Sequence, residues 1–244
     1  MRVIRAFVDL PLREGDTITL PDDAAAHLVR VLRLREGEHC VLFNGDGYDH
    51  EAQLTRADKR GAAARIGAGR PVALESPLRI VLLQGIARGE KMDWILQKAT
   101  ELGVAAIVPV SSERSEVRLD AERAGKRHAH WRSVVVSACE QSWRARVPEV
   151  AAPQSLAAAL ATLPPGTGRW LLDPEATAGL TTMPAPAGEL VLAIGPEGGW
   201  SANDRAALVA AGFAGLRLGP RILRTETAGI AAIAALQARF GDLG

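Results

Sequence analysis

The chain contains few of the residues that build disulfide frameworks or metal sites. Only two of its 244 residues are cysteines, Cys40 and Cys139, and they lie far apart without a partner motif. Two such cysteines argue against a disulfide framework and a zinc site, and they suit a reducing compartment. The five histidines do not take up metal-ligand spacing either. We therefore expect no bound metal and a cytoplasmic location.

Long apolar runs and a strong net charge are also absent. No run approaches the roughly 20 residues that span a bilayer. Residues 1–7 lack the apolar core and cleavage site of a signal peptide, so we expect no membrane association. The formal net charge is only +1, so a nucleic-acid surface would have to be a local patch. The hydrophobic share of 48% is that of a globular protein.

Several standard nucleotide-binding and catalytic motifs are missing. The sequence has no GxxxxGK[ST] phosphate loop, no GxGxxG after the first strand of either expected domain, and no GxSxG elbow. These absences argue against a P-loop nucleoside triphosphatase, an ordinary Rossmann enzyme and an α/β-hydrolase.

What is present falls into two parts. Residues 1–72 hold short apolar pieces between turn signals such as Asn44-Gly45-Asp46-Gly47, a pattern that predicts a small β-barrel. Beyond a proline-containing linker, residues 73–244 alternate apolar runs with helical patterns, which predicts an α/β fold with a parallel, doubly wound sheet. The predicted strands are 78–84, 105–110, 169–172 and 190–194; the predicted helices are 90–102, 121–139, 155–163 and 227–240, with another capped by Ser201 and Asp204.

One helix is expected among the strands of residues 1–72. An apolar stripe at i, i+3 and i+4 is formed by Leu28, Val31 and Leu32. Polar residues follow at three-residue steps on its flank, namely His27, Arg30 and Arg33. They form either a solvated helix face, which is the usual case, or a ridge that contacts phosphates.

Two glycine-proline loops organise the second part. Residues 194–201 follow the apolar run Leu190–Ile194, and residues 218–227 follow a shorter run. In open α/β sheets, ligands bind in loops at the carboxyl ends of strands. Glycines 195, 198 and 199 let the backbone approach a ligand closely and leave amides free to bond it. One loop alone is typical of an ordinary turn, whereas the pair indicates a binding site.

The side chains of these loops indicate the kind of ligand. The charged ones are Glu197, Arg221, Arg224 and Glu226, and the apolar ones are Ile194, Leu218, Ile222 and Leu223. Such a site suits a ligand with a flat apolar part and polar edges, such as adenosine. Residues 111–147 add a modest basic patch, with eight Lys and Arg against five Asp and Glu.

The pair GPEGGWS (195–201) and LGPRILRTET (218–227) closely resembles the signature of the ribosomal RNA uridine-N3 methyltransferases of the trefoil-knotted SPOUT superfamily. Other blocks agree along nearly the whole chain, namely residues 1–7, 27–33, 91–103, 112–115 and 140–142. One departure is Trp143, where the family more often has a small residue.

The resemblance implies a fold, a reaction and partners. A PUA-like barrel (1–72) is joined to a knotted methyltransferase domain (73–244), and the enzyme acts as a homodimer with S-adenosylmethionine as cofactor. Its substrate is one uridine of 16S ribosomal RNA in the small ribosomal subunit. Two alternatives stay open: a knotted methyltransferase acting on another RNA position, and a non-catalytic RNA-binding ribosome-assembly factor.

The resemblance also assigns residues. Cofactor contacts fall on Leu172, Ile194, Gly195, Pro196, Glu197, Gly198, Gly199, Leu218, Gly219, Ile222, Leu223, Thr225 and Ala228. RNA contacts fall on Arg2, Arg5, His27, Arg30 and Arg33, together with Arg114, Arg144 and Arg146.

Catalytic candidates follow from the chemistry of uridine N3. Removing its proton moves negative charge onto the ring carbonyl oxygens, and an arginine aimed at them would stabilise that charge as an oxyanion hole does. Arg224 is the first candidate and Arg221 the second. Glu197 or Glu226 could take the proton; alternatively, either carboxylate only caps local amides.

Overall fold

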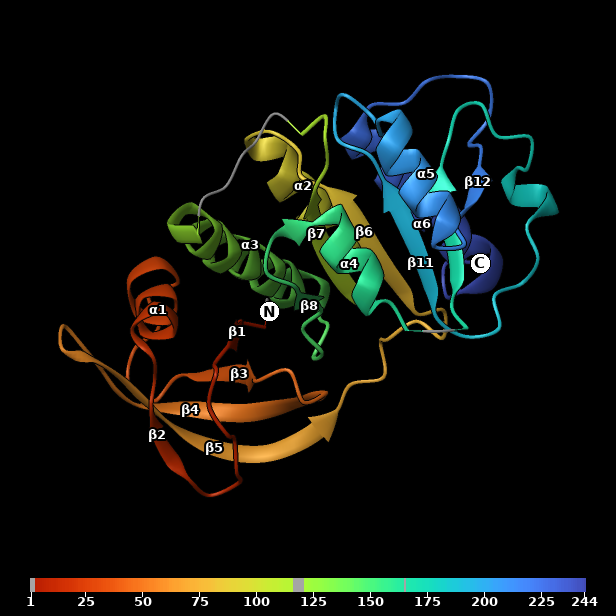
Figure 1. Cartoon of the computed structure of the whole chain (residues 1–244). Helices are drawn as coiled ribbons and strands as arrows, with labels where there is room; N and C mark the ends of the chain where they lie inside the picture. The colour runs from red at the N-terminus through yellow and green to blue at the C-terminus, as the bar shows by residue number, and fades with distance from the viewer. Residues whose placement is uncertain (1–2, 116–120, 165) are drawn as a thin grey trace. The chain divides into compact units, whose positions relative to one another are not determined.

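The computed structural model, shown in Figure 1, describes residues 3–115, 121–164 and 166–244. The chain forms two compact units, of which the first comprises residues 1–75 with 136–147 and the second comprises 76–135 with 148–244. Neither compact unit is one continuous stretch of the sequence. The units therefore do not test the predicted domain boundary after residue 72, which stays a prediction. Within the described ranges, no helix is long and apolar enough to cross a membrane.

The first unit is built on a five-stranded sheet with the order β1-β3-β4-β5-β2. Its strands are β1 Arg5–Phe7, β2 Thr17–Thr19, β3 His39–Phe43, β4 Tyr48–Asp58 and β5 Gly61–Pro71. β1 and β3 are parallel and the other pairs are antiparallel. β4 is not predicted from the sequence, because only His50, Ala52 and Leu54 are buried along its eleven residues. A strand with one weakly apolar face and many charges gives little hydrophobic signal.

The expected helix of this unit is present, but its predicted apolar stripe is wrong. A short α-helix, α1 (Asp22–Ala25), continues as the π-helix η1 (Ala26–Val31). Leu28 is fully buried, whereas Val31 is 67% exposed and Leu32 is 37% exposed. The Leu32 N–H bonds the carbonyl of His27, five residues back, at 3.0 Å. This wider turn rotates the later residues away from the face that an α-helical period assigns to them.

Arg5 joins segment 136–147 to the sheet of the first unit. Its guanidinium is paired with Asp49 (Nη2–Oδ1 2.8 Å) and lies 3.8 Å from the centroid of the Phe43 ring. It also donates to the carbonyls of Cys139 (2.7 Å) and Arg144 (2.8 Å). Cys139 is in the last turn of α3 (Ala121–Ser142), where carbonyl groups lack helical partners. Arg5 therefore caps the end of that helix.

This packing corrects two of the expected RNA contacts. The side chain of Arg5 is 2% exposed and that of Arg144 is 4% exposed. Arg144 is paired with Glu75, and its Nε donates to Oε1 at 3.1 Å. Both guanidinium groups are used inside the first unit, so we assign them structural roles and remove them from the RNA-contacting set.

The second unit is an α/β fold with a parallel sheet, as predicted. Its strand order is β12-β10-β11-β6-β7-β8, with β9 paired to β7, and every pairing is parallel. The strands are β6 Ile80–Gly85, β7 Ala106–Ser111, β8 Glu149–Val150, β9 Gln154–Ser155, β10 Gly168–Leu172, β11 Leu190–Ile194 and β12 Ala214–Leu216. β6 and β11 are buried along their whole length, as central strands of a sheet covered on both faces should be.

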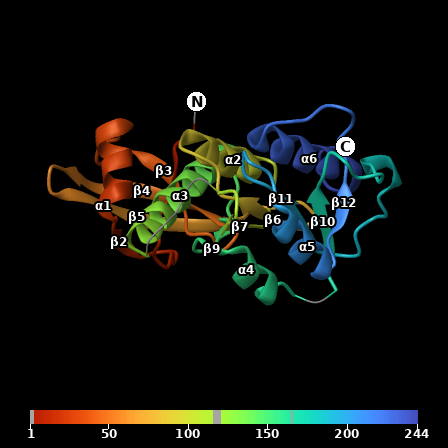
Figure 2. The same cartoon turned by 45° about the horizontal axis from the view of Figure 1, so that its top comes forward.

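Helices cover both faces of this sheet. The helices after residue 75 are α2 Glu90–Glu101, α3, α4 Leu156–Thr162, α5 Ala202–Ala210 and α6 Thr225–Phe240, with the 3₁₀-helix η2 Leu180–Thr182. Figure 2 shows α2 and α6 on one face and α4 and α5 on the other. The predicted capping box is confirmed, because the Ser201 hydroxyl accepts from the Asp204 N–H and the Asp204 carboxylate accepts from the Ser201 N–H. α6 begins two residues earlier than predicted, which places Thr225 and Glu226 in its first turn.

Replacing Arg5 by Met should lower the free energy of unfolding of the first unit by about 3 kcal/mol, because Asp49 and two carbonyl groups lose their partner. Urea unfolding of the whole chain, followed by far-ultraviolet circular dichroism, measures this loss. Arg13→Met is the matched control at an exposed position, and it should change stability by less than about 0.5 kcal/mol. Equal unfolding curves for both variants would show that Arg5 does not hold the unit together.

Candidate active site

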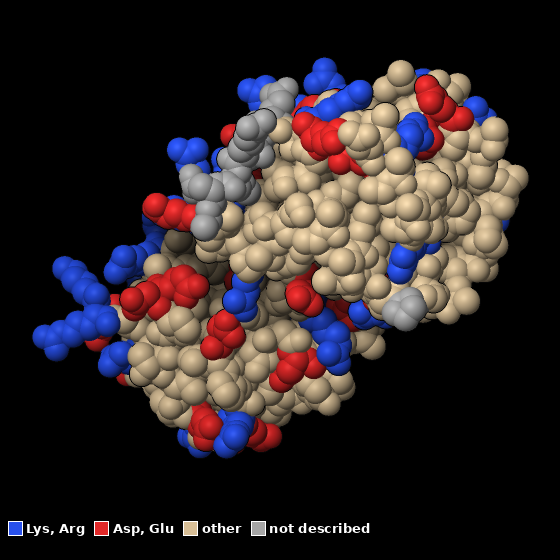
Figure 3. All heavy atoms as spheres, viewed as in Figure 1, with Lys and Arg blue, Asp and Glu red and all other residues tan. Residues whose placement is uncertain are grey.

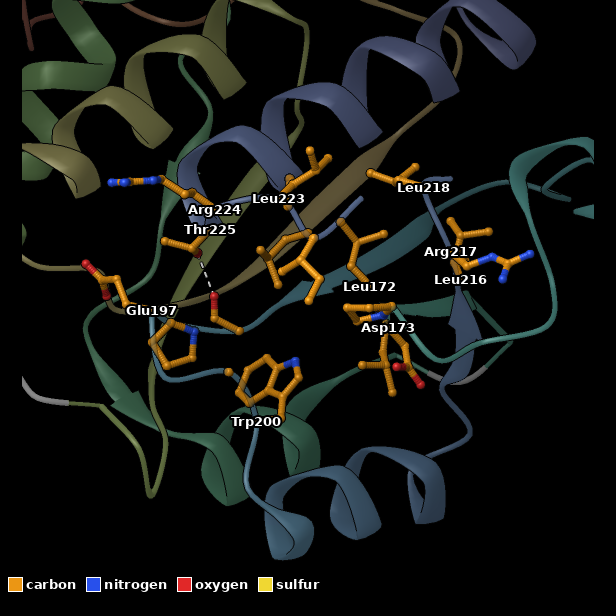
Figure 4. A pocket seen from close by; sticks show the side chains of 18 of the residues that line it. Leu172, Asp173, Glu197, Trp200, Leu216, Arg217, Leu218, Leu223, Arg224 and Thr225 are labelled. Atoms are coloured by element: carbon orange, nitrogen blue, oxygen red, sulfur yellow. Dashed lines mark hydrogen bonds between the residues drawn. The ribbon is translucent and has the colours of Figure 1, made fainter. Parts of the chain in front are cut away.

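A pocket of about 480 Å³ lies where β10, β11 and β12 end and α6 begins. Its volume is within the usual range for small-molecule sites. Both glycine-proline loops line it, as Figure 4 shows. The pocket is lined by the four catalytic candidates, Arg224, Arg221, Glu197 and Glu226, and by every predicted cofactor residue except Gly198. The two loops predicted from the sequence therefore form one site.

The walls of the pocket are mainly aliphatic. The apolar side chains come from the ends of three neighbouring strands and from the second loop, and comprise Leu171, Leu172, Ile194, Leu216, Leu218, Ile222 and Leu223. Ile222 is 86% exposed, so it projects from the second loop with little packing around it. The backbone of the glycine loops supplies the polar edges. This combination suits a flat ring with hydrogen-bonding edges.

The first loop turns tightly over the end of β6. The Gly199 N–H bonds the Pro196 carbonyl at 2.8 Å, and Gly199 has a φ of 66°. A Cβ added to Gly85 would lie 2.5 Å from Cδ of Pro196. Any larger residue at position 85 would therefore displace the loop, which makes glycine necessary there.

Glu197 anchors this loop to the start of α2 and the residues just before it. Its Oε1 accepts hydrogen bonds from the backbone N–H of Arg88 and from Nζ of Lys91, each at 3.1 Å. Partial burial opposes ionisation, but bonds from its own N–H, from Arg88 and from Lys91 outweigh this, so the pKa of Glu197 lies below its usual value. A carboxylate held by donors and with a lowered pKa is a poor proton acceptor. The contacts favour an anchoring role.

A second contact holds Gly198, which is not among the lining residues of the pocket. Arg114 Nη1 donates to the Gly198 carbonyl at 3.2 Å. A Cβ on Gly198 would lie 3.1 Å from Cβ of Arg114. The neighbouring Glu113 accepts from Asn203 Nδ2 at 2.8 Å. The segment around Arg114, which the sequence analysis assigned to RNA, also supports the first loop.

One hydrogen bond joins the two loops directly. The hydroxyl of Thr225, at the start of α6, donates to the carbonyl of Gly195 at 2.6 Å, and Figure 4 draws this bond as a dashed line. Thr225 is buried. The family resemblance assigns Thr225 to the cofactor, and in the structure its hydroxyl bonds the first loop.

The polar end of the pocket is not predicted from the sequence. Asp173 follows β10 and is paired with Arg205 of α5 through both carboxylate oxygens. The Arg205 hydrogen bond is the main cause of the lowered pKa of Asp173. Asp173 could have been found, because it directly follows a predicted strand at the same sheet edge as the loops. Arg205 gave no such signal, since the facing side of α5 depends on tertiary packing.

Arg224 and Arg221 both line the pocket and are exposed. Within the described residues, neither guanidinium makes a hydrogen bond or an ion pair. Arg224 is the N-cap residue of α6, and Figure 4 shows its side chain extending outward from the pocket beside Glu197. Both arginines are therefore available to a substrate placed at the mouth of the pocket.

The remaining RNA candidates lie in the first unit or outside the described residues. Arg30 and Arg33 are exposed, and Arg33 has a φ of 60° just beyond η1. His27 is half-buried and Arg146 is exposed. Arg2 lies outside the described residues. Figure 3 shows basic and acidic side chains interspersed over the viewed face, in keeping with the net charge of +1.

Comparisons with known proteins place the chain in a family. Residues 74–237 match the model of an RNA methyltransferase domain, and residues 20–67 match that of an RNA methyltransferase PUA domain. The ribosomal RNA small subunit methyltransferase E of Buchnera aphidicola (subspecies Schizaphis graminum) is 34% identical over 99% of this chain and 98% of the relative. The chain belongs to this methyltransferase family.

Two solved structures match the entire chain. The ribosomal RNA small subunit methyltransferase E of Neisseria gonorrhoeae, bound to S-adenosyl methionine, is 42% identical with a TM-score of 0.92, and each chain is covered to 100%. A protein of Legionella pneumophila, solved with bound SAM, is 37% identical with a TM-score of 0.95 at the same coverage. The predicted family is thereby confirmed, as is its pairing of an N-terminal PUA domain with a parallel α/β domain.

Replacing Glu197 by Gln should leave turnover at saturating substrate concentrations within about threefold of the parent. The amide oxygen can still accept from Arg88, and only the ion pair with Lys91 is lost. Removing a general base would instead cost about 100-fold or more. Steady-state kinetics with methylated small-subunit RNA as product distinguish the two roles. A loss of turnover of about 100-fold would show that Glu197 acts as the general base.

Proposed function

We propose that this chain uses S-adenosylmethionine to methylate N3 of one uridine in the 16S ribosomal RNA of the small ribosomal subunit. The observation that carries the proposal is the single pocket formed by both signature loops, with the exposed Arg221 and Arg224 among its lining residues. The full-length similarity to small-subunit rRNA methyltransferases supports the class of substrate.

The residues of the pocket fit this cofactor. Aliphatic side chains such as Leu172 and Leu218 would cover the faces of an adenine ring, and the glycine-rich backbone would bond its edges. Asp173 and Arg217 supply charged groups at the other end for the polar part of the molecule. When bound, the cofactor supplies an activated methyl group on its sulfonium, so the transfer requires no metal.

The chain itself must expose the base and stabilise its charge. N3 lies on the Watson–Crick edge, so the uridine has to be unpaired or splayed out before it can react. Arg224 and Arg221 would then stabilise the negative charge on the ring oxygens when the N3 proton passes to water. Glu197 would hold the first loop in place rather than take that proton.

RNA contacts are assigned to exposed arginines. Arg30, in the last turn of η1, and Arg33, just beyond it, would contact phosphates, with Arg114 and Arg146 as further contacts. Arginine suits this role because its fork binds phosphate in two places and its plane stacks on bases.

From the family resemblance we also propose a homodimer, cytoplasmic action and a trefoil-knotted path of the second domain.

Titration calorimetry should show that the purified chain binds S-adenosylmethionine, and mass mapping should place the added methyl group on uridine N3 of small-subunit RNA. Absence of cofactor binding would favour a non-catalytic assembly factor. Methylation of a ribose or of another base atom would favour a methyltransferase of different position specificity. Either result would contradict the proposed reaction.

Arg224→Ala should keep cofactor affinity within about threefold but reduce turnover by about 100-fold or more, the loss typical when an oxyanion-stabilising donor is removed. Arg224→Lys is the matched variant: it keeps the charge without the planar fork and should be intermediate. Single-turnover methylation of small-subunit particles measures both. Unchanged turnover in the alanine variant would remove Arg224 from the mechanism.

A further inference from the structure

Gln84 is a polar side chain in a strand that is otherwise apolar and wholly buried. β6 has the sequence Ile-Val-Leu-Leu-Gln-Gly, and Gln84 is 0% exposed. Its Oε1 is buried and has no hydrogen-bond partner among the described residues. A buried amide oxygen without a partner costs stability, and an apolar side chain would avoid that cost. Core packing therefore does not explain the glutamine.

The hydrogen bonds of the Gln84 amide nitrogen account for a glutamine at this position. Nε2 donates to the Gly85 carbonyl at 2.8 Å and to the hydroxyl of Thr225 at 3.2 Å. The Thr225 hydroxyl in turn donates to the Gly195 carbonyl at 2.6 Å. Since a hydroxyl has one hydrogen to donate, the Gln84 donor directs that hydrogen toward Gly195. The three residues form one chain of hydrogen bonds.

This series of hydrogen bonds lies where it can affect the shape of the pocket. Gln84 pairs with Ile194 across β6 and β11, directly before the first glycine-proline loop. Thr225 directly follows Arg224, the last residue of the second loop before α6. A bond from Thr225 to Gly195 therefore sets the distance between the loop that lines the cofactor site and the arginine beside it.

We propose that Gln84 and Thr225 are positioning residues that hold the two loops in register. This role rests on the proposed function, because the loops are taken as the cofactor site. Gln84 and Thr225 act through Gly195 and Arg224, and their polar groups need not touch the substrate. Loss of the link should loosen the first loop even though every residue of that loop remains.

The test compares Thr225→Val, which keeps the shape but removes the hydroxyl, with Thr225→Ser, which keeps the hydroxyl. The valine variant should weaken S-adenosylmethionine binding about tenfold, the size expected for one lost hydrogen bond, and the serine variant should stay within about threefold. Gln84→Met should weaken binding in the same way. The double variant Gln84→Met with Thr225→Val should bind S-adenosylmethionine as well as Thr225→Val alone, because both substitutions break the same series of hydrogen bonds.

Amide hydrogen exchange of the ligand-free protein gives a readout that does not depend on the cofactor. The amides of residues 195 and 197–199 should exchange faster in Thr225→Val than in the parent and in Thr225→Ser. Unchanged exchange, equal binding by the valine and serine variants, or additive losses in the double variant would each overturn the positioning role. If the parent itself fails to bind the cofactor, the proposed function falls, and the exchange comparison still decides the role of the link.

Discussion

The hydrogen bond between the Thr225 hydroxyl and the Gly195 carbonyl is the contact on which the candidate site depends. It joins two loops that are separated in sequence but follow strands at the same edge of the parallel sheet. Around it, other contacts fix the first loop: Gly85 leaves room for Pro196, Glu197 is held by Arg88 and Lys91, and Gly198 by Arg114. A backbone pocket of this kind is preorganised by its surroundings.

The sequence predicted the location of the site better than the roles within it. Glycine-proline turns after apolar runs place the loops at the sheet edge, because Pro and Gly act through local backbone chemistry. The roles of Glu197 and Thr225 depend on partners more than 25 residues away, which no local pattern contains. Arg205 was missed for the same reason, since its pairing with Asp173 depends on how α5 packs.

In the fold, too, features with a strong local sequence pattern were predicted, and features that depend on tertiary packing were not. Strands β6 and β11 are strongly apolar, and their predicted positions differ from the observed ones by two residues at most. The strand β4 and the π-helix η1 were not recognised, because one has a weak apolar face and the other departs from the 3.6-residue period. Arg5 and Arg144 were assigned to RNA because an arginine in the sequence does not reveal that it is buried.

The capping of α3 by Arg5 has a consequence for how this protein can be divided. The first unit is discontinuous: the carbonyl groups that complete the coordination of its buried guanidinium come from residues 139 and 144. A fragment ending at residue 75 would retain Asp49 but lose both carbonyls and the partner of Glu75. The N-terminal part therefore cannot be excised by one cut in the chain without removing two acceptors of the buried Arg5 guanidinium. A fragment that retains these contacts would have to include residues 136–147.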